Sequence, residues 1–145
     1  MTGRNAPTPP LPDPDDPVLG GYWAAVARGE LVVQRCAACE QVQWPPRDSC
    51  GRCGPAELRW LPVAGTGTLF TWTVVHHTTV AAYAGALPFA VGVVELDDAP
   101  ARMLGRLRGV PPEKLEMDMP VEVAFEPVAP GIALPVWQPA GGGPR

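Results

Sequence analysis

Four cysteines constrain this chain most strongly, because they form two Cys-x-x-Cys pairs separated by ten residues. They are Cys36, Cys39, Cys50 and Cys53, and no other cysteine occurs among the 145 residues. Thiolates are soft ligands, and two such pairs can present four sulfurs at the corners of a tetrahedron. The spacing therefore predicts that these four residues hold a structural Zn²⁺ ion. Such a closed site shapes the protein and leaves no coordination position for chemistry.

Two disulfides or an iron centre would use the same four cysteines. Disulfides are typical of exported domains, but Met1–Pro17 is polar and proline-rich and contains no apolar segment of the signal-peptide type. No run of about 18 apolar residues predicts a membrane span. We therefore expect a cytoplasmic protein without membrane association, in which reduced thiols favour metal over disulfides. A rubredoxin-like electron carrier containing iron remains an alternative.

The distribution of proline indicates the domain organisation. Eleven of the 20 prolines lie before residue 18 or after residue 126, and proline excludes helix interiors and central strands. We predict five segments in order along the chain: a disordered proline-rich tail (1–12), an N-terminal helix (13–30), a zinc ribbon (31–60), an OB-fold domain (61–138) and a flexible tail (139–145).

A short helix is predicted to follow the acidic and proline-rich residues 13–17 and to end at Gly29. Four apolar residues recur at helical spacing: Leu19, Tyr22, Trp23 and Val26. Tyr22 and Trp23 either pack against the domain or act as large anchors for a partner. Together with Trp44 and Arg47 of the ribbon, they form the predicted partner interface.

The remaining pattern predicts a mainly β fold. Short strands at 31–35, 41–44 and 57–60 flank the cysteine pairs. Beyond residue 61 the pattern has period two and predicts five strands: 68–76, 89–96, 102–108, 121–126 and 132–137. A helical turn at 111–117 separates the third strand from the fourth, which is the order of an OB-fold barrel. We expect Phe70, Trp72 and Val74 to share one face, and the last strand to lie at an edge because it contains Pro135. The predicted architecture is an N-terminal helix, a zinc ribbon and a five-stranded OB-fold barrel.

The sequence lacks the groups that an independent active site needs. His76 and His77 are neighbours in a predicted strand and so point to opposite faces. No nucleophile–base pair, phosphate-binding loop or hydrolase motif can be named. We therefore predict no catalytic residues and no activity of the chain alone. The 15 acidic and 11 basic residues include no basic patch, so we expect no nucleic acid as partner, although ribbons and OB-folds also occur in nucleic-acid-binding proteins.

A series of short motifs runs in order along the chain: Cys36-x-x-Cys39, Trp44-Pro45-Pro46-Arg47, Cys50-x-x-Cys53, Gly65-Thr66-Gly67-Thr68, Thr73-Val74-Val75-His76, Pro88-Phe89-Ala90 and Pro120-Val121-Glu122-Val123-Ala124-Phe125. With these motifs, residues 18–137 resemble the family of rubredoxin-like zinc-ribbon plus OB-fold proteins, formerly a domain family of unknown function, which is associated with acyl-CoA metabolism. The turn Asp97-Asp98-Ala99-Pro100 departs from the acidic-Gly turn of the family.

This resemblance implies a non-catalytic subunit of a hetero-oligomer. Its partner would be a thiolase-superfamily enzyme, such as a thiolase or a lipid-transfer-protein-like retro-aldolase, acting on acyl-CoA thioesters. Some members look like stand-alone versions of a domain fused to a hydratase in steroid side-chain degradation. Bound acyl-CoA would need cations for its phosphates, but the candidate arginines can equally pair with acids, so the CoA-binding residues stay unknown. These candidates are Arg47, Arg59, Arg102, Arg106 and Arg108.

Overall fold

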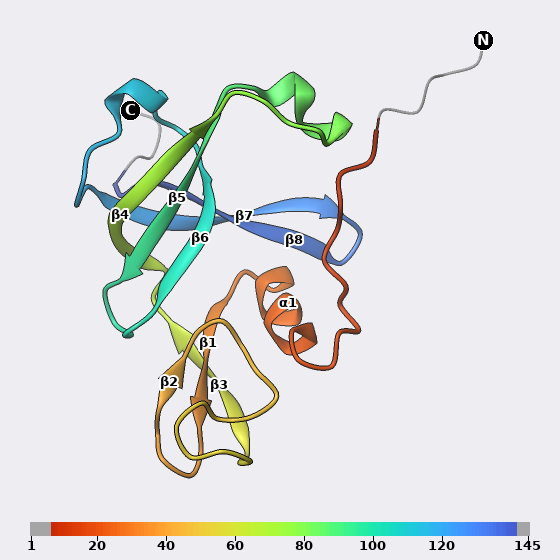
Figure 1. Ribbon diagram of the computed structural model, residues 1–145, viewed down its shortest axis with the longest axis vertical. Helices are drawn as coiled ribbons and strands as arrows, with labels where there is room; N and C mark the ends of the chain where they lie inside the picture. Colours follow the sequence, from red (N-terminus) through yellow and green to blue (C-terminus); the bar gives the residue numbers. More distant parts are fainter. Residues whose placement is uncertain (1–6, 142–145) are drawn as a thin grey trace.

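The computed structural model describes residues 7–141 and contains a small three-stranded sheet, one α-helix and a closed five-stranded barrel (Figure 1). The predicted mainly β architecture is confirmed. The predicted disorder of residues 1–6 and flexibility of residues 142–145 lie outside the described residues.

The chain forms its elements in a simple order. The N-terminal half contains α1 (Gly20–Ala27), β1 (Leu31–Cys36), β2 (Val42–Gln43), β3 (Leu58–Val63) and β4 (Thr66–Val75). A 3₁₀-helix, η1 (Ala81–Ala86), precedes the second half, which contains β5 (Phe89–Leu96), β6 (Arg102–Leu107), η2 (Pro112–Lys114), β7 (Pro120–Ala129) and β8 (Ile132–Pro139).

Helix α1 is shorter than the predicted segment 13–30: it begins at Gly20, after a turn that contains the acidic residues, and it ends before Gly29 as expected. The carboxylate of Asp16 accepts the backbone N–H of Leu19 at 2.7 Å, and this bond holds the pKa of Asp16 below its usual value. At the other end Gly29 has a φ of +79° and donates its N–H to the carbonyl of Val26 at 2.9 Å. The next residue, Glu30, donates to the carbonyl of Ala25 at 2.9 Å, which completes a Schellman motif.

The two sheets are built differently. In the ribbon, β1 lies between β2 and β3 and is antiparallel to both. In the barrel the strand order is β4-β5-β6-β8-β7, and β4 closes the ring by pairing with β7. Helix α1 packs on β1 of the ribbon and on β8 of the barrel. One short helix is therefore packed against both sheets.

The prediction that the last strand lies at an edge is wrong. Strand β8 lies between β7 and β6 and completes the barrel. Its only residue pair with β6 is Trp137 with Leu107. Pro135 lies two residues before this contact, so its missing N–H does not interrupt the pairing with β6.

Phe70 and Trp72 do not share a face as predicted, because a β-bulge in β4 interrupts the alternation. Leu69 and Thr71 pair with the consecutive residues Val94 and Val93 of β5, so Phe70 is the extra residue. Trp72 packs against the core. Phe70 instead stays 41% exposed on the outer surface. The alternation predicted that the two rings share a face, but the inserted residue reverses the direction of one of them.

The barrel interior depends on close contact between a large and a very small residue. Trp137 is 1% exposed and is one of the largest buried side chains. Gly105 on β6 faces it, and a Cβ atom on Gly105 would lie 2.6 Å from Cδ1 of Trp137. The indole therefore occupies the space that any larger residue at position 105 would need.

We expect Gly105→Ala to lower the free energy of unfolding by about 1–3 kcal/mol, because the added methyl group overpacks the site against the buried indole. Urea unfolding followed by tryptophan fluorescence measures this change. Gly85→Ala is the matched control, since a Cβ on Gly85 would meet no atom within 4 Å. Equal stability of the two variants would show that the indole can move aside without cost.

Candidate metal centre

The four cysteine sulfurs converge in one cluster. The Sγ atoms of Cys36 and Cys53 are 3.6 Å apart, as are those of Cys39 and Cys50. All four lie within 4.8 Å of one another. Sulfurs around a tetrahedral metal with bonds of about 2.3 Å are separated by about 3.8 Å, so small movements would complete such a shell. The four thiolates therefore fit a single metal ion with no coordination position left open.

Two similar turns, the knuckles, present these sulfurs. The first follows β1, and the second is closed by reciprocal backbone hydrogen bonds between Cys50 and Gly54, both 3.0 Å long. The residue after the second cysteine has a left-handed backbone in both turns, with φ of +64° at Glu40 and +88° at Gly54. Glycine adopts this conformation freely. Glu40 adopts it as a non-glycine residue, and its carboxylate pairs with Arg35 at 3.1 Å.

Backbone N–H groups favour the thiolate form of two of the cysteines, Cys36 and Cys50. The N–H groups of Cys53 and Arg52 donate to Sγ of Cys50 at 3.5 and 3.4 Å and lower the pKa of Cys50 to about 6. The N–H of Cys39 is the main cause of the lowered pKa of Cys36. The contact with Cys36 is the main reason that the pKa of Cys53 is raised to about 12. A metal ion would displace the protons that the sulfurs still share.

A buried glutamine holds the ribbon together in a way that the sequence pattern did not reveal. Gln34 on β1 is 4% exposed. Its amide nitrogen donates to the carbonyl of Arg47 at 2.8 Å, and its amide oxygen accepts the N–H of Arg47 at 2.9 Å. The same oxygen accepts a hydrogen bond from Gln43, whose own oxygen accepts the N–H of Gly51 at 3.0 Å. Gln34 and Gln43 thus connect β1, the turn at Arg47 and the second knuckle.

The predicted interface residues fall into two groups. Tyr22 is 5% exposed, and burial raises its pKa. Its ring lies 5.0, 4.9 and 6.5 Å from the rings of Trp23, Trp44 and Trp60. It therefore packs inside the chain and has little surface left for a partner. Trp23 and Trp44 are only half-buried and Arg47 is exposed, so these three offer more surface to a partner, and the interface stays a prediction.

The two histidines, the other candidates for chemistry in the sequence, do not form a site among residues 7–141. His76 and His77 are exposed and lie just beyond the end of β4. Within the described part of the chain, the cysteine cluster is the group of metal-ligating side chains that comes together. No helix in this part of the chain has the length and apolar character needed to cross a membrane.

We expect Gln34→Leu to destabilise the ribbon by about 2 kcal/mol, because both backbone groups of Arg47 lose buried hydrogen-bond partners. Release of the metal to a chromophoric chelator should be correspondingly faster. Gln41→Leu makes the same change at an exposed glutamine of the ribbon and should behave like the wild type. Identical metal release from both variants would mean that the network does not support the knuckles.

Comparisons with known proteins match both parts of this architecture. A family model described as "ChsH2, rubredoxin-like zinc ribbon domain" matches residues 23–59, and one described as "ChsH2, C-terminal OB-fold domain" matches residues 60–126. The solved structure of an "Ltp2-ChsH2(DUF35) aldolase" superposes with a TM-score of 0.78 at 34% identity, covering 86% of this chain and 96% of that chain.

Two curated relatives are longer proteins. A "probable enoyl-CoA hydratase alpha subunit" of Thermomonospora curvata is 35% identical over 119 residues, which are 82% of this chain and 36% of the relative. The "3-oxo-4,17-pregnadiene-20-carboxyl-CoA hydratase alpha subunit" of Mycobacterium tuberculosis is 31% identical over 118 residues, again 36% of the relative and 81% of this chain. This chain thus spans about a third of their length. The matches cover the knuckles, the ribbon strands and most of the barrel, and the chain belongs to the ChsH2 (DUF35) family of proteins that join a rubredoxin-like zinc ribbon to an OB-fold domain.

Proposed function

We propose that this chain is a non-catalytic, zinc-binding subunit that supports a thiolase-superfamily enzyme acting on acyl-CoA thioesters. The observation that carries this proposal is the match to the DUF35 chain of the Ltp2-ChsH2 aldolase, which extends over nearly all of that chain. In such a complex the enzyme performs the chemistry, and this chain supplies a folded surface.

The relatives suggest the class of substrate. One of them is a hydratase subunit for a pregnadiene carboxyl-CoA, which is a steroid thioester. The structural match is to an aldolase. A retro-aldolase that cleaves a steroid side chain from its CoA thioester is therefore the partner that we propose, with a hetero-oligomer of the two chains as the active form.

The metal that we propose is zinc in a structural role. Four sulfurs and no open position are typical of structural zinc sites. The ribbon is too small to build a sufficient core alone, so the metal would supply part of its folding energy. The purified protein should be colourless and contain about one zinc per chain by mass spectrometry of its metals. A red protein with stoichiometric iron would instead support electron transfer.

The function is tested by reconstitution with an Ltp2-type aldolase. The aldolase is produced with and without this chain, and retro-aldol cleavage of a steroid β-hydroxyacyl-CoA is measured. We expect stable co-elution of the two chains and substantially higher activity or stability of the enzyme in the complex. A stable and fully active aldolase that ignores this chain would contradict the proposal.

We expect Cys36→Ala to lose the metal and the partner together, because the ribbon then lacks a ligand and cannot hold its knuckles. Metal content and co-elution with the aldolase are measured on the same preparation. Ala37→Ser alters the neighbouring exposed residue and should preserve both properties. Normal partner binding by a metal-free Cys36→Ala variant would show that the ribbon is dispensable for docking.

A further inference from the structure

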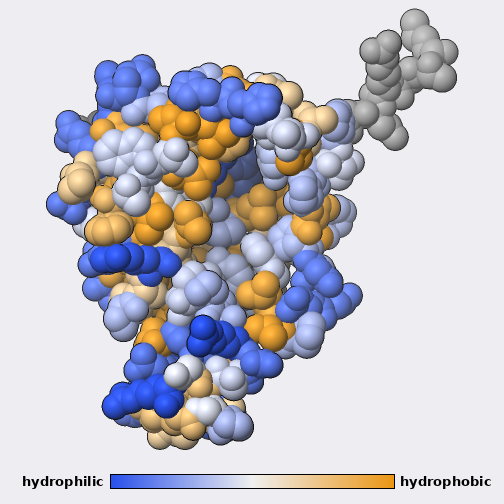
Figure 2. Space-filling view, viewed as in Figure 1, coloured by the Kyte–Doolittle hydropathy of each residue, from blue (hydrophilic) through white to orange (hydrophobic). Residues whose placement is uncertain are grey.

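The outer face of β6 carries an exposed leucine between two arginines. Arg102, Leu104 and Arg106 occupy alternate positions of the strand and point away from the barrel, whereas Met103 and Leu107 are buried. Leu104 is 71% exposed. In Figure 2, hydrophobic side chains gather over β4, β5 and β6 and are interrupted by hydrophilic ones. We call the three outward residues of β6 the β6 ridge.

Both arginines of the β6 ridge lie against aromatic rings. The Cζ atom of Arg102 is 3.8 Å from the ring centroid of Phe70, which the bulge in β4 turns outward. The Cζ atom of Arg106 is 5.0 Å from the centroid of Phe89 on β5. Stacking restricts the guanidinium groups in advance while their N–H edges can still donate to an incoming carboxylate. Binding an anion would therefore cost less side-chain entropy than it costs at freely moving arginines.

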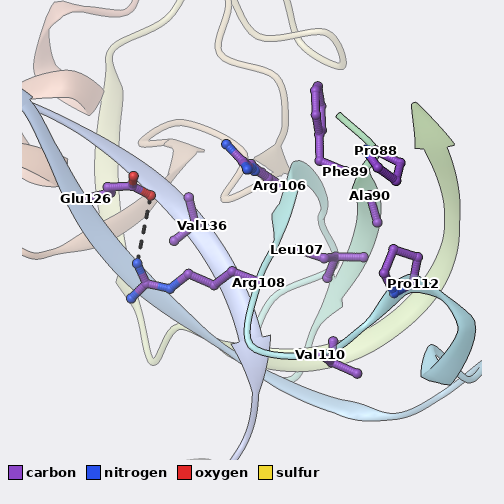
Figure 3. A pocket seen from close by; sticks show the side chains of 10 residues that line it. All are labelled: Pro88, Phe89, Ala90, Arg106, Leu107, Arg108, Val110, Pro112, Glu126 and Val136. Atoms are coloured by element: carbon purple, nitrogen blue, oxygen red, sulfur yellow. Dashed lines mark ion pairs between the residues drawn. The ribbon is translucent and has the colours of Figure 1, made fainter. Parts of the chain in front are cut away.

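The charge of Arg106 is not neutralised within the described chain. Arg102 pairs with Glu95 at 3.1 Å, and Arg108 pairs with Glu126 at 3.8 Å, but Arg106 has no acidic partner among residues 7–141. Figure 3 shows Arg108 joined to Glu126 while the Arg106 guanidinium points elsewhere. The ridge thus presents an uncompensated positive charge.

A pocket adjoins the β6 ridge at this end. It has a volume of about 290 Å³, and Arg106 and Phe89 form part of its wall. Its apolar lining includes Ala90, Leu107 and Val136, all nearly buried (Figure 3). The pocket lies where β6 and β8 share a single residue pair. Its size suits one apolar side chain rather than a large ligand.

We propose that the β6 ridge and this pocket are a docking surface for the thiolase-superfamily enzyme, which presents an apolar side chain flanked by carboxylates. This inference rests on the proposed function and adds a second contact region, on the barrel, to the one predicted on the ribbon. The carboxylates pair with Arg106 and Arg102, and the apolar side chain covers Leu104 or enters the pocket. The arginines and aromatic rings that border the exposed Leu104 belong to the residue types that are enriched at protein interfaces.

The same geometry disfavours two other occupants. In a symmetric contact with a second copy of the chain, the ridge would face itself and bring arginines together without added acids. Single-stranded nucleic acid needs uncovered rings for base stacking, and guanidinium groups cover Phe70 and Phe89 here. An acidic and apolar protein surface is therefore the complement that fits.

The test compares Leu104→Asp with Met117→Asp in binding to an Ltp2-type aldolase, measured by biolayer interferometry with full-length chains. Both residues are exposed apolar side chains, at 71% and 69%, but Met117 lies in the connection before β7, outside the ridge. We expect Leu104→Asp and Arg106→Glu to weaken binding by about 10-fold or more and Met117→Asp to leave it unchanged. Unaltered melting temperature and metal content of each variant establish that the fold is intact.

The outcomes distinguish a failure of the proposed function from a failure of the docking surface alone. If the wild-type chain does not bind the aldolase, the proposed function fails and the docking surface fails with it. If the wild type binds and Leu104→Asp binds equally well, the docking surface is wrong while the proposed function stands. Loss of wild-type self-association, or of binding to a fluorescent oligonucleotide, as the main effect of these substitutions would also overturn the proposal.

Discussion

The ribbon has too little core to fold alone, and the rest of the structure depends on how this deficit is met. Its sheet has three strands, of which β2 contains two residues, and a sheet this small needs a hydrophobic face or a packed helix to be stable. The four converging sulfurs can hold a metal ion, which would provide one support. Helix α1 provides the other, because it buries Tyr22 against the ribbon and also packs on β8. The element that completes the ribbon therefore also sets its position against the barrel.

This double support extends to the turn at Trp44 and Arg47, which is part of the predicted partner interface. Its backbone is fixed by the buried amide of Gln34, and the ring of Trp44 packs on Tyr22 at 4.9 Å. Through Gln43 the same network reaches Gly51 in the second knuckle. A metal ion bound by the four cysteines would thus stabilise the turn at Trp44 and Arg47 through this hydrogen-bond network and the packing of Trp44. It would stabilise a binding surface without touching the partner.

The sequence predicts this fold well wherever local pattern decides the structure. The cysteine spacing identifies the cluster, and period-two alternation identifies all five barrel strands, because both depend on near neighbours in the chain. The predictions for Phe70 and Pro135 are wrong because the environments of these residues depend on distant segments. The register between β4 and β5 sets the direction of Phe70, and closure of the barrel places the strand of Pro135 between two others. The sequence left both roles of Tyr22 open, since its packing against tryptophans of the ribbon also depends on distant segments. The role of Gln34 was missed because a polar residue in a strand gives no sign of its hydrogen-bond partners.

The distribution of arginines connects these separate observations. Five of them pair with acids nearby in the fold: Arg28, Arg35, Arg59, Arg102 and Arg108. Within residues 7–141, Arg47 and Arg52 on the ribbon and Arg106 on the barrel have no such pair. Exposed ion pairs contribute little to stability, so unpaired arginines matter more for the orientation of a charged partner. A partner that contacts both the ribbon arginines, Arg47 and Arg52, and Arg106 on the barrel must span the two sheets. The fixed placement of the two sheets by α1 then becomes a requirement for binding and not only for folding.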